Sequence, residues 1–202
     1  MSARTRLRPD QRRQQLLDVA ARNFAAQPYH DVSMADIAAE ARVSRALLYR
    51  YYPTKRHLFA AVYKAAAERL LEASADPGHG SITAWVLAGL EAHFDFFETN
   101  ARTVLEANRG EMAGDPVIEA IITDELAELR RSILDSMALT GHERSAASAA
   151  LYGWLTFVRA VCVEWLAEES LTRTELRDMC LRTLVAALDL REAPGEQFAR
   201  GR

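Results

Sequence analysis

The sequence predicts an all-α protein built from about nine helices. Apolar residues recur at the i, i+3, i+4 spacing of a helix along the whole chain, and the alternating apolar pattern of strands is absent. Capping residues, prolines and glycines divide this pattern into segments of helical length. With 202 residues, 50% hydrophobic content and nine glycines, the chain can bury one or two ordinary cores.

The first helix presents one apolar side to a small core. That side is formed by Leu16, Leu17, Ala20, Ala21 and Phe24. A shorter helix comes next, in which the hydroxyl of Ser33 is placed to cap the N-terminus. Ile37, Ala38 and Ala41 supply its apolar side. The two helices are therefore expected to share one core.

A third helix is expected directly after a tight turn. Ser44 is placed to cap it, and Leu48 and Tyr52 occupy its inward positions, with Val43 in the turn. The outward positions are Arg45, Ala46, Tyr49, Arg50 and Tyr51. Arginine pairs with guanine edges or phosphates, and phenol hydroxyls donate to phosphate oxygens. An ordinary helical hairpin with a charged surface is the alternative, but the paired caps and this outer face together favour a unit that reads double-stranded DNA.

A long helix is expected to follow Pro53, which ends the third one. Thr54 is placed to cap this fourth helix, over residues 54–75. Lys55 would then lie at a helix N-terminus, where backbone N–H groups and its ammonium hold a phosphate. At about 1.5 Å per residue the helix spans about 30 Å, long enough to leave the N-terminal domain and enter the next.

The charge of the chain is unevenly distributed. Residues 1–75 hold 13 Lys and Arg against 7 Asp and Glu, whereas the remainder holds 12 against 21. The net charge of −3 therefore combines a basic N-terminal third with an acidic remainder, which directs one end toward a polyanion. Five arginines would form either an arm over the DNA backbone or a solvated tail. They are Arg4, Arg6, Arg8, Arg12 and Arg13.

The second part of the chain begins after a clear break at residues 76–80, Asp-Pro-Gly-His-Gly, and Ser81 is placed to cap the next helix. Thr172 and Glu175 form a capping-box pattern at the start of the last helix. The end of the chain, from residue 193, is expected to be a loose tail. Five helices are expected, over residues 81–99, 101–112, 115–139, 143–168 and 172–190.

Aromatic rings and a few polar groups recur in this second part, where they would either line a ligand cavity or pack as ordinary core. Arg159 stands within an apolar run from residue 151 to 166. It would anchor a ligand carboxylate or form a salt bridge with Glu106, Glu111 or Glu164. The candidate pocket residues are Trp85, His93, Phe97, Tyr152, Phe157 and Arg159.

Several function classes find no support in the sequence. The two cysteines, Cys162 and Cys180, lie in apolar helical stretches without Cys-x-x-Cys spacing, which predicts buried thiols in a reducing, cytoplasmic setting rather than a redox switch. The chain has no run of 18 apolar residues and no signal-like start, so we expect it neither to span a membrane nor to be exported. No metal-ligand spacing, cofactor motif or catalytic constellation is present, so no metal, no cofactor and no enzymatic activity are expected.

The motifs of the first 75 residues resemble the N-terminal domain of TetR-type transcriptional regulators. They are Phe24, Ser33, Ile37-Ala38, Val43-Ser44 and the run Leu48-Tyr49-Arg50-Tyr51-Tyr52-Pro53-Thr54-Lys55. Two positions depart from the family pattern. Arg42 stands where the family commonly has glycine, and a positive φ there would cost on the order of 1 kcal/mol unless a phosphate contact offsets it. Pro28 stands where a glycine often follows the first helix, and should tighten that loop.

The resemblance implies a two-domain architecture. Residues 1–53 would form the N-terminal arm and a three-helix helix-turn-helix DNA-binding domain, the helix over 54–75 would link the domains, and residues 76–202 would form a helical ligand-binding and dimerisation domain. The DNA-binding residues would be Ser33, Arg42, Ser44, Arg45, Ala46, Tyr49, Arg50, Tyr51, Thr54 and Lys55.

The resemblance also implies that the last two long helices pair with their copies in a second subunit, whereas periodicity alone fits packing within one chain equally well. The interface candidates are Ala146, Ala149, Gly153, Leu176, Met179, Leu184 and Leu188. The expected partners are a palindromic operator in double-stranded DNA, a second copy of the chain and a small-molecule effector. The predicted function is a homodimeric repressor released from its operator by that effector, and the alternative is an effector-independent architectural or activating dimer.

Overall fold

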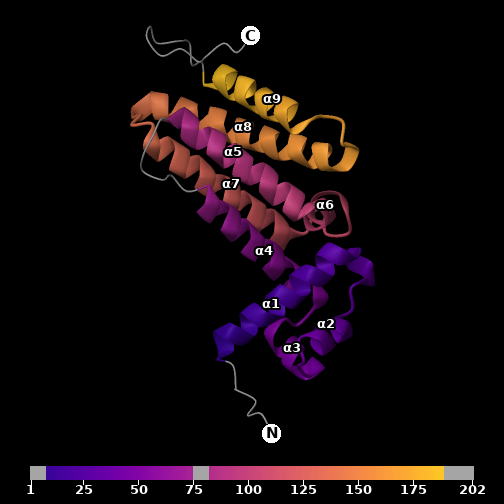
Figure 1. The fold of residues 1–202 in the computed structure, drawn as a ribbon. Helices are drawn as coiled ribbons and strands as arrows, with labels where there is room; N and C mark the ends of the chain where they lie inside the picture. The colour runs from indigo at the N-terminus through magenta and orange to yellow at the C-terminus, as the bar shows by residue number, and fades with distance from the viewer. Residues whose placement is uncertain (1–7, 75–81, 189–202) are drawn as a thin grey trace. The chain divides into compact units, whose positions relative to one another are not determined.

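The computed structural model describes residues 8–74 and 82–188, and all regular structure in these ranges is helical (Figure 1). The all-α prediction is therefore confirmed for the described part of the chain. The expected break at 76–80, the cap at Ser81, the arginines at positions 4 and 6, and the tail from residue 193 lie outside it.

The elements occur in the expected order. The N-terminal part contains α1 (Pro9–Ala26), the 3-10 turn η1 (Tyr29–Asp31), α2 (Met34–Glu40), α3 (Arg45–Tyr51) and α4 (Lys55–Ala73). The second part contains α5 (Ile82–Thr99), α6 (Ala101–Arg109), α7 (Pro116–Ser136), α8 (Gly141–Glu168) and α9 (Arg173–Ala187). The expected ends were too late for α6 and α7: α6 stops before Gly110, and α7 stops three residues short of position 139.

Contacts divide the described residues into two units. Unit 1 holds residues 8–70 and 96–122, and unit 2 holds residues 71–74, 82–95 and 123–188. The helices α4, α5 and α7 each begin in one unit and end in the other. Contacts therefore group residues 96–122 with the helix-turn-helix, although chain order alone suggested the second domain. The functional domain assignment itself stays a prediction.

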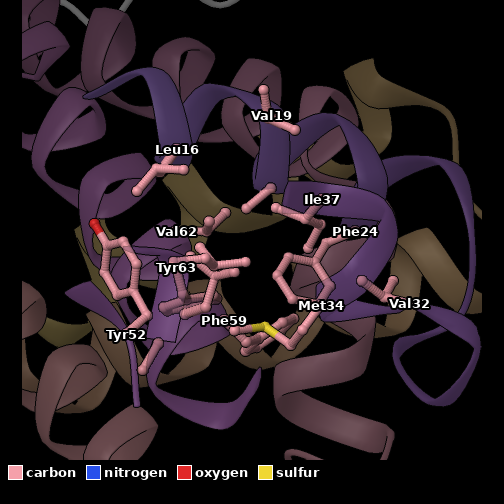
Figure 2. Close-up of a cluster of buried hydrophobic side chains, with 14 of the residues drawn as sticks. Leu16, Val19, Phe24, Val32, Met34, Ile37, Tyr52, Phe59, Val62 and Tyr63 are labelled. Carbon is pink, nitrogen blue, oxygen red and sulfur yellow. The ribbon is translucent and has the colours of Figure 1, made fainter. Parts of the chain in front are cut away.

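The core of unit 1 is apolar and aromatic. Figure 2 shows the side chains of Phe24, Met34 and Phe59 gathered from α1, α2 and α4. The ring of Phe59 meets Phe24 edge to face at 5.1 Å between centroids and Tyr29 at 5.5 Å. Since aromatic pairs of this geometry favour one relative orientation, they hold α1, η1 and α4 together. Ala107, Met112 and Ile118 add apolar surface from α6 and α7 to the same core.

Unit 2 is built around the α8–α9 hairpin. The indole nitrogen of Trp154 donates to the carbonyl oxygen of Cys180 at 2.8 Å, which joins the two helices. At the start of α9, Thr172 and Glu175 form the expected capping box. Arg173 follows it and pairs with Glu91 on α5, with 2.7 Å between nitrogen and oxygen. The hairpin is therefore bound to α5 as well as closed on itself.

Helix α8 is long and apolar enough, by length and composition alone, to cross a membrane. A core helix of a soluble protein meets the same criterion. Part of α8 is core in this sense, since Leu151, Val158 and Cys162 are buried within unit 2.

Candidate DNA interface and internal cavity

The two short helices α2 and α3 start where their serines predict. The hydroxyl of Ser33 accepts a hydrogen bond from the backbone N–H of Ala35 at 3.1 Å, and the hydroxyl of Ser44 accepts one from Leu47 at 3.2 Å. Each bond satisfies a donor that the first turn of a helix leaves unpaired. Both caps are therefore confirmed, and they position α3 with its outer side intact.

The turn between these helices is closed by two backbone hydrogen bonds. Val43 N–H donates to Ala38 at 2.9 Å and Arg42 N–H donates to Ala39 at 3.0 Å, the pattern of a Schellman helix end. Such an end requires a left-handed residue, and Arg42 adopts it with a φ of 54°. The positive φ considered from the sequence is thus present at a non-glycine residue. Gln15 braces the turn through a 3.1 Å bond to the carbonyl of Ala41.

The outer side of α3 is exposed. Arg45, Ala46 and Arg50 are open to solvent, and Tyr49 retains 46% of its surface. Tyr51 is half-buried, and the guanidinium of Arg50 lies 5.8 Å from its ring centroid. The two inward positions are buried as predicted, and they are Leu48 and Tyr52. The helix therefore presents two arginines and a tyrosine outward from a short, fixed platform.

Lys55 makes contacts that the sequence did not reveal. Its ammonium donates to the backbone carbonyls of Tyr29 at 2.7 Å and His30 at 3.2 Å, and lies 4.4 Å from the centre of the Tyr29 ring. These contacts join the start of α4 to η1. The free chain thus engages Lys55 internally, and any phosphate contact would have to share its ammonium. Its partners are backbone carbonyls, which no residue motif identifies.

Thr54 caps α4, as predicted. Its hydroxyl accepts from the backbone N–H of His57 at 3.2 Å and lies 2.8 Å from the ring nitrogen Nδ1 of the same histidine. His57 is exposed beside the groove edge and was not among the predicted residues. A histidine three residues after a capping threonine is the sequence signal that would have found it.

An open groove runs along these elements in unit 1. It brings together five predicted residues, Ser33, Arg45, Tyr49, Thr54 and Lys55, with Val32, Met34, Ala35 and Pro53. The remaining predicted residues lie on the turn and on α3, and are Arg42, Ser44, Ala46, Arg50 and Tyr51. The predicted DNA face is therefore spatially continuous, although the structure holds no nucleic acid.

Polar contacts hold the α6–α7 segment to the base of this face. Asp115 is buried, pairs with Arg56 of α4, and accepts from the backbone N–H groups of Val117 at 2.8 Å and Ile118 at 3.1 Å. Burial opposes ionisation of this carboxyl, but the bonds from Ile118 and Arg56 outweigh it and lower its pKa. Asp115 is therefore charged at neutral pH and fixes the start of α7.

Unit 2 contains an internal cavity of about 50 Å³. Its lining comes from the end of α4 and from α5, α7 and α8. The lining residues are Ser74, Trp85, Val86, Gly89, Leu90, His93, Leu126, Leu129, Ile133, Trp154, Leu155 and Val158. Because most of these side chains are apolar, the cavity suits an apolar ligand.

The predicted pocket residues occupy different places. Trp85 and His93 lie on the cavity wall. Phe97 is fully buried in unit 1, and Phe157 is half-buried on α8. Tyr152 is 55% exposed, with the guanidinium of Arg130 lying 5.5 Å from its ring centroid.

Arg159 is buried, and the structure pairs it with Glu125, a residue that the sequence analysis did not name. The distance between Nη1 of Arg159 and Oε2 of Glu125 is 3.9 Å. Burial raises the pKa of Glu125 although Arg159 opposes this effect, whereas burial and Arg159 together lower the pKa of His93 to about 3. His93 is therefore neutral at physiological pH.

The predicted interface residues divide into exposed and buried sets. Ala146, Ala149 and Gly153 of α8 are exposed, and a Cβ added at Gly153 would meet no atom within 4 Å. In α9, Met179 and Leu188 are half-buried. Leu176 and Leu184 are already buried within the single chain. The exposed small residues of α8 thus form an open face, whereas these two leucines contribute to packing within unit 2.

Both cysteines are free and buried, as expected, and burial raises the pKa of Cys162 strongly and that of Cys180 to about 11. Thiols with raised pKa values are poor nucleophiles. Within residues 8–74 and 82–188, no group of three or more His, Cys, Asp or Glu side chains is arranged to hold a metal ion.

Known proteins share both the motif and the fold. Residues 16–62 match the family model described as bacterial regulatory proteins, tetR family. The HTH-type transcriptional activator FasR from Mycolicibacterium smegmatis is 32% identical over 99 residues, which is 48% of this chain and 45% of that protein. The match therefore spans about half the length of this curated relative.

Among solved structures, a tetR-family transcriptional regulator from Streptomyces coelicolor matches with a TM-score of 0.79 and 25% identity, over 90% of this chain and 82% of the other. A TetR-like transcriptional regulator from Rhodococcus sp. RHA1 matches with a TM-score of 0.63 and 25% identity, over 92% of this chain and 100% of the other. Proteins of this family are DNA-binding transcription factors rather than enzymes. The family model, the relative and the solved structures together support one identification: this chain is a TetR-family transcriptional regulator.

Proposed function

We propose that this protein binds a palindromic operator as a homodimer and regulates transcription in response to a small molecule held in unit 2. The observation that carries the proposal is the exposed outer side of α3, where Arg45, Tyr49 and Arg50 project from a helix that is capped at its start. Arginine at such positions reads guanine edges, and a tyrosine hydroxyl donates to phosphate.

Dimerisation is supported by the open face of α8. Ala146, Ala149 and Gly153 share one side of this helix and are exposed in the single chain. Small residues allow a second helix to approach closely, and a dimer presents two recognition helices to two half-sites. A single helix-turn-helix unit buries too little surface for strong specific binding, which a second subunit remedies.

Effector response is supported by the connection between the cavity and α4. Trp85 and Ser74 both line the cavity, and the indole nitrogen of Trp85 donates to the carbonyl oxygen of Ser74 at 3.0 Å. Ser74 directly follows α4, whose first residue, Lys55, borders the groove of the DNA face. A ligand that displaces Trp85 would release the end of α4 and favour another arrangement of the recognition helices.

The proposed sense of regulation is repression relieved by the effector. Repositioning of the recognition helices by a few ångströms breaks phosphate contacts, because half-sites lie about 34–36 Å apart, or a multiple of that distance. Activation is the second candidate, favoured by the name of the relative from Mycolicibacterium smegmatis, a transcriptional activator. Transcription from a promoter carrying the selected operator, measured with and without the protein, separates the two.

The first experiment is selection of bound fragments from a random DNA pool at fixed salt, read by sequencing. A motif with two symmetric half-sites supports a dimer that reads sequence. An Arg45→Ala variant should then lose preference at one position of each half-site, by about 1–3 kcal/mol for a paired base contact. Recovery of unselected sequence contradicts specific regulation and favours an architectural DNA-binding protein.

A further inference from the structure

The cavity of unit 2 has a polar side next to its apolar wall. His93 lines the cavity, and the charge of Arg159 acts on both His93 and Glu125. Glu125 and Arg159 each directly adjoin a lining residue, Leu126 on α7 and Val158 on α8. The wall is therefore apolar over most of its area, and three polar side chains are gathered at one part of it.

Glu125 lacks a hydrogen-bond donor. Its side chain is 1% exposed, and neither carboxylate oxygen accepts a hydrogen bond from the described part of the chain. Arg159 lies 3.9 Å away, which is beyond hydrogen-bond distance. A buried acceptor left without a donor is costly, so this side of the cavity favours a molecule that supplies one.

The same surroundings disfavour a charged molecule. The Arg159–Glu125 pair carries one charge of each sign, and His93 adds none at neutral pH because burial and Arg159 hold its pKa at about 3. A cation placed against Glu125 would also face Arg159, and an anion placed against Arg159 would also face Glu125. Since an additional buried charge has no counterion here, desolvation opposes its entry.

We propose that this cavity binds a short, uncharged aliphatic molecule with a hydroxyl group, and that the hydroxyl donates a hydrogen bond to Glu125. A cavity of about 50 Å³ is smaller than the roughly 150 Å³ cavity that accepts benzene, so the apolar part of the ligand is small. The hydroxyl satisfies the carboxylate, and the chain packs between Trp85, Leu90 and Trp154. The assignment rests on the proposed effector response only for its biological role.

The test uses three molecules that share one four-carbon chain: 1-butanol, butylammonium and butyrate. Each is added at the same millimolar concentration to the full-length protein labelled with ¹⁵N, and the indole N–H signals are recorded by NMR. Trp85 and Trp154 line the cavity, whereas Trp165 donates to the carbonyl of Leu171 in the α8–α9 hairpin and serves as an internal control. We expect 1-butanol to shift the signals of Trp85 and Trp154 and to leave that of Trp165 in place.

A double variant tests the role of Glu125. Glu125→Met with Arg159→Met removes the pair without leaving an unpaired buried charge, so the protein is expected to fold. Its affinity for 1-butanol should fall about tenfold, the effect of one lost hydrogen bond to a charged acceptor. Glu128→Gln is the matched control, because Glu128 lies on the same helix, is well exposed and pairs with Arg131. This control should bind 1-butanol as the unchanged protein does.

Two results would overturn the proposal. Butyrate that shifts the two signals at lower concentration than 1-butanol would make Arg159 the anchor, and no shift with any of the three molecules would remove the cavity as a site for this class. Because binding is read without DNA, the ligand class is decided separately from regulation. Binding of 1-butanol that leaves operator affinity unchanged would support the ligand class and contradict the effector response.

Discussion

Units 1 and 2 differ in what their interiors contain. The centre of unit 1 is filled by contacting aromatic and aliphatic side chains such as Phe24 and Phe59. The interior of unit 2 contains a cavity and buries His93, Glu125 and Arg159. A filled apolar core holds one geometry, which a DNA-reading face requires, whereas a cavity with polar side chains allows more than one packing. The difference suggests a rigid reader and an adjustable sensor.

The largest expected effect concerns the filled core. Phe59→Ala should destabilise the protein by about 3–5 kcal/mol, because it removes a ring that meets Phe24 and Tyr29 and leaves a cavity behind. Urea unfolding measures the change. Leu129→Ala at the wall of the existing cavity is the comparison, and it should cost less because that side chain is only partly buried. Equal losses would show that the two interiors are equally packed.

Acid should affect unit 2 before unit 1. His93 has a lowered pKa of about 3 against an ordinary 6.5, so the unfolded chain binds a proton that the folded chain does not. The stability from neutral His93 is present above pH 6.5 and falls with pH below it, by about 1.4 kcal/mol per pH unit. Asp115 in unit 1 has a lowered pKa instead, and its contribution is lost only as pH falls below its ordinary value of 3.8.

The pH dependence is measured by urea unfolding at several pH values for the unchanged protein and for His93→Phe. Glu125 shifts in the opposite direction, since burial raises its pKa, so the difference between the two proteins isolates His93. A difference that is constant between about pH 7 and about pH 5, which bracket the ordinary histidine pKa, would contradict the assignment.

A smaller effect tests the connection between cavity and α4. Trp85→Phe removes the indole N–H that reaches Ser74 but keeps a ring on the wall, at a cost of about 1 kcal/mol. The response of operator affinity to a bound ligand should weaken. Trp154→Phe is the matched control, because Trp154 lines the same cavity but donates to Cys180 of α9. Fluorescence anisotropy of labelled operator, with and without ligand, measures both, and equal responses would exclude Trp85 as the link.

Two backbone changes compare the units at about the same small magnitude. Arg42→Gly relieves a φ of 54° in unit 1 and should stabilise the protein by about 1 kcal/mol. Gly89→Ala in α5 adds a methyl group that meets no atom within 4 Å, and should stabilise by about 0.5–1 kcal/mol while narrowing the cavity. Thermal unfolding measures both changes. Gly153→Ala on the exposed face of α8 is the control that changes helix propensity alone.

Sequence reasoning succeeded best where one residue acts on its immediate neighbours. The caps at Ser33, Ser44 and Thr54 each depend on a hydroxyl within three residues of its donor, so the pattern contains the whole interaction. It was less complete for Lys55 and Arg159. Their partners are the carbonyls of η1 and the carboxylate of Glu125, which approach only when distant segments pack.

The sequence by itself determined the helical fold, the helix order and the residues on the outer side of α3, because periodicity and caps are local properties of the chain. Only the tertiary structure decided that residues 96–122 pack with the DNA-reading unit, that a cavity lies among α5, α7 and α8, and that Glu125 is buried without a donor. These features arise from side chains far apart in the chain that meet in space. Their positions depend on how the helices pack, and no local pattern specifies that.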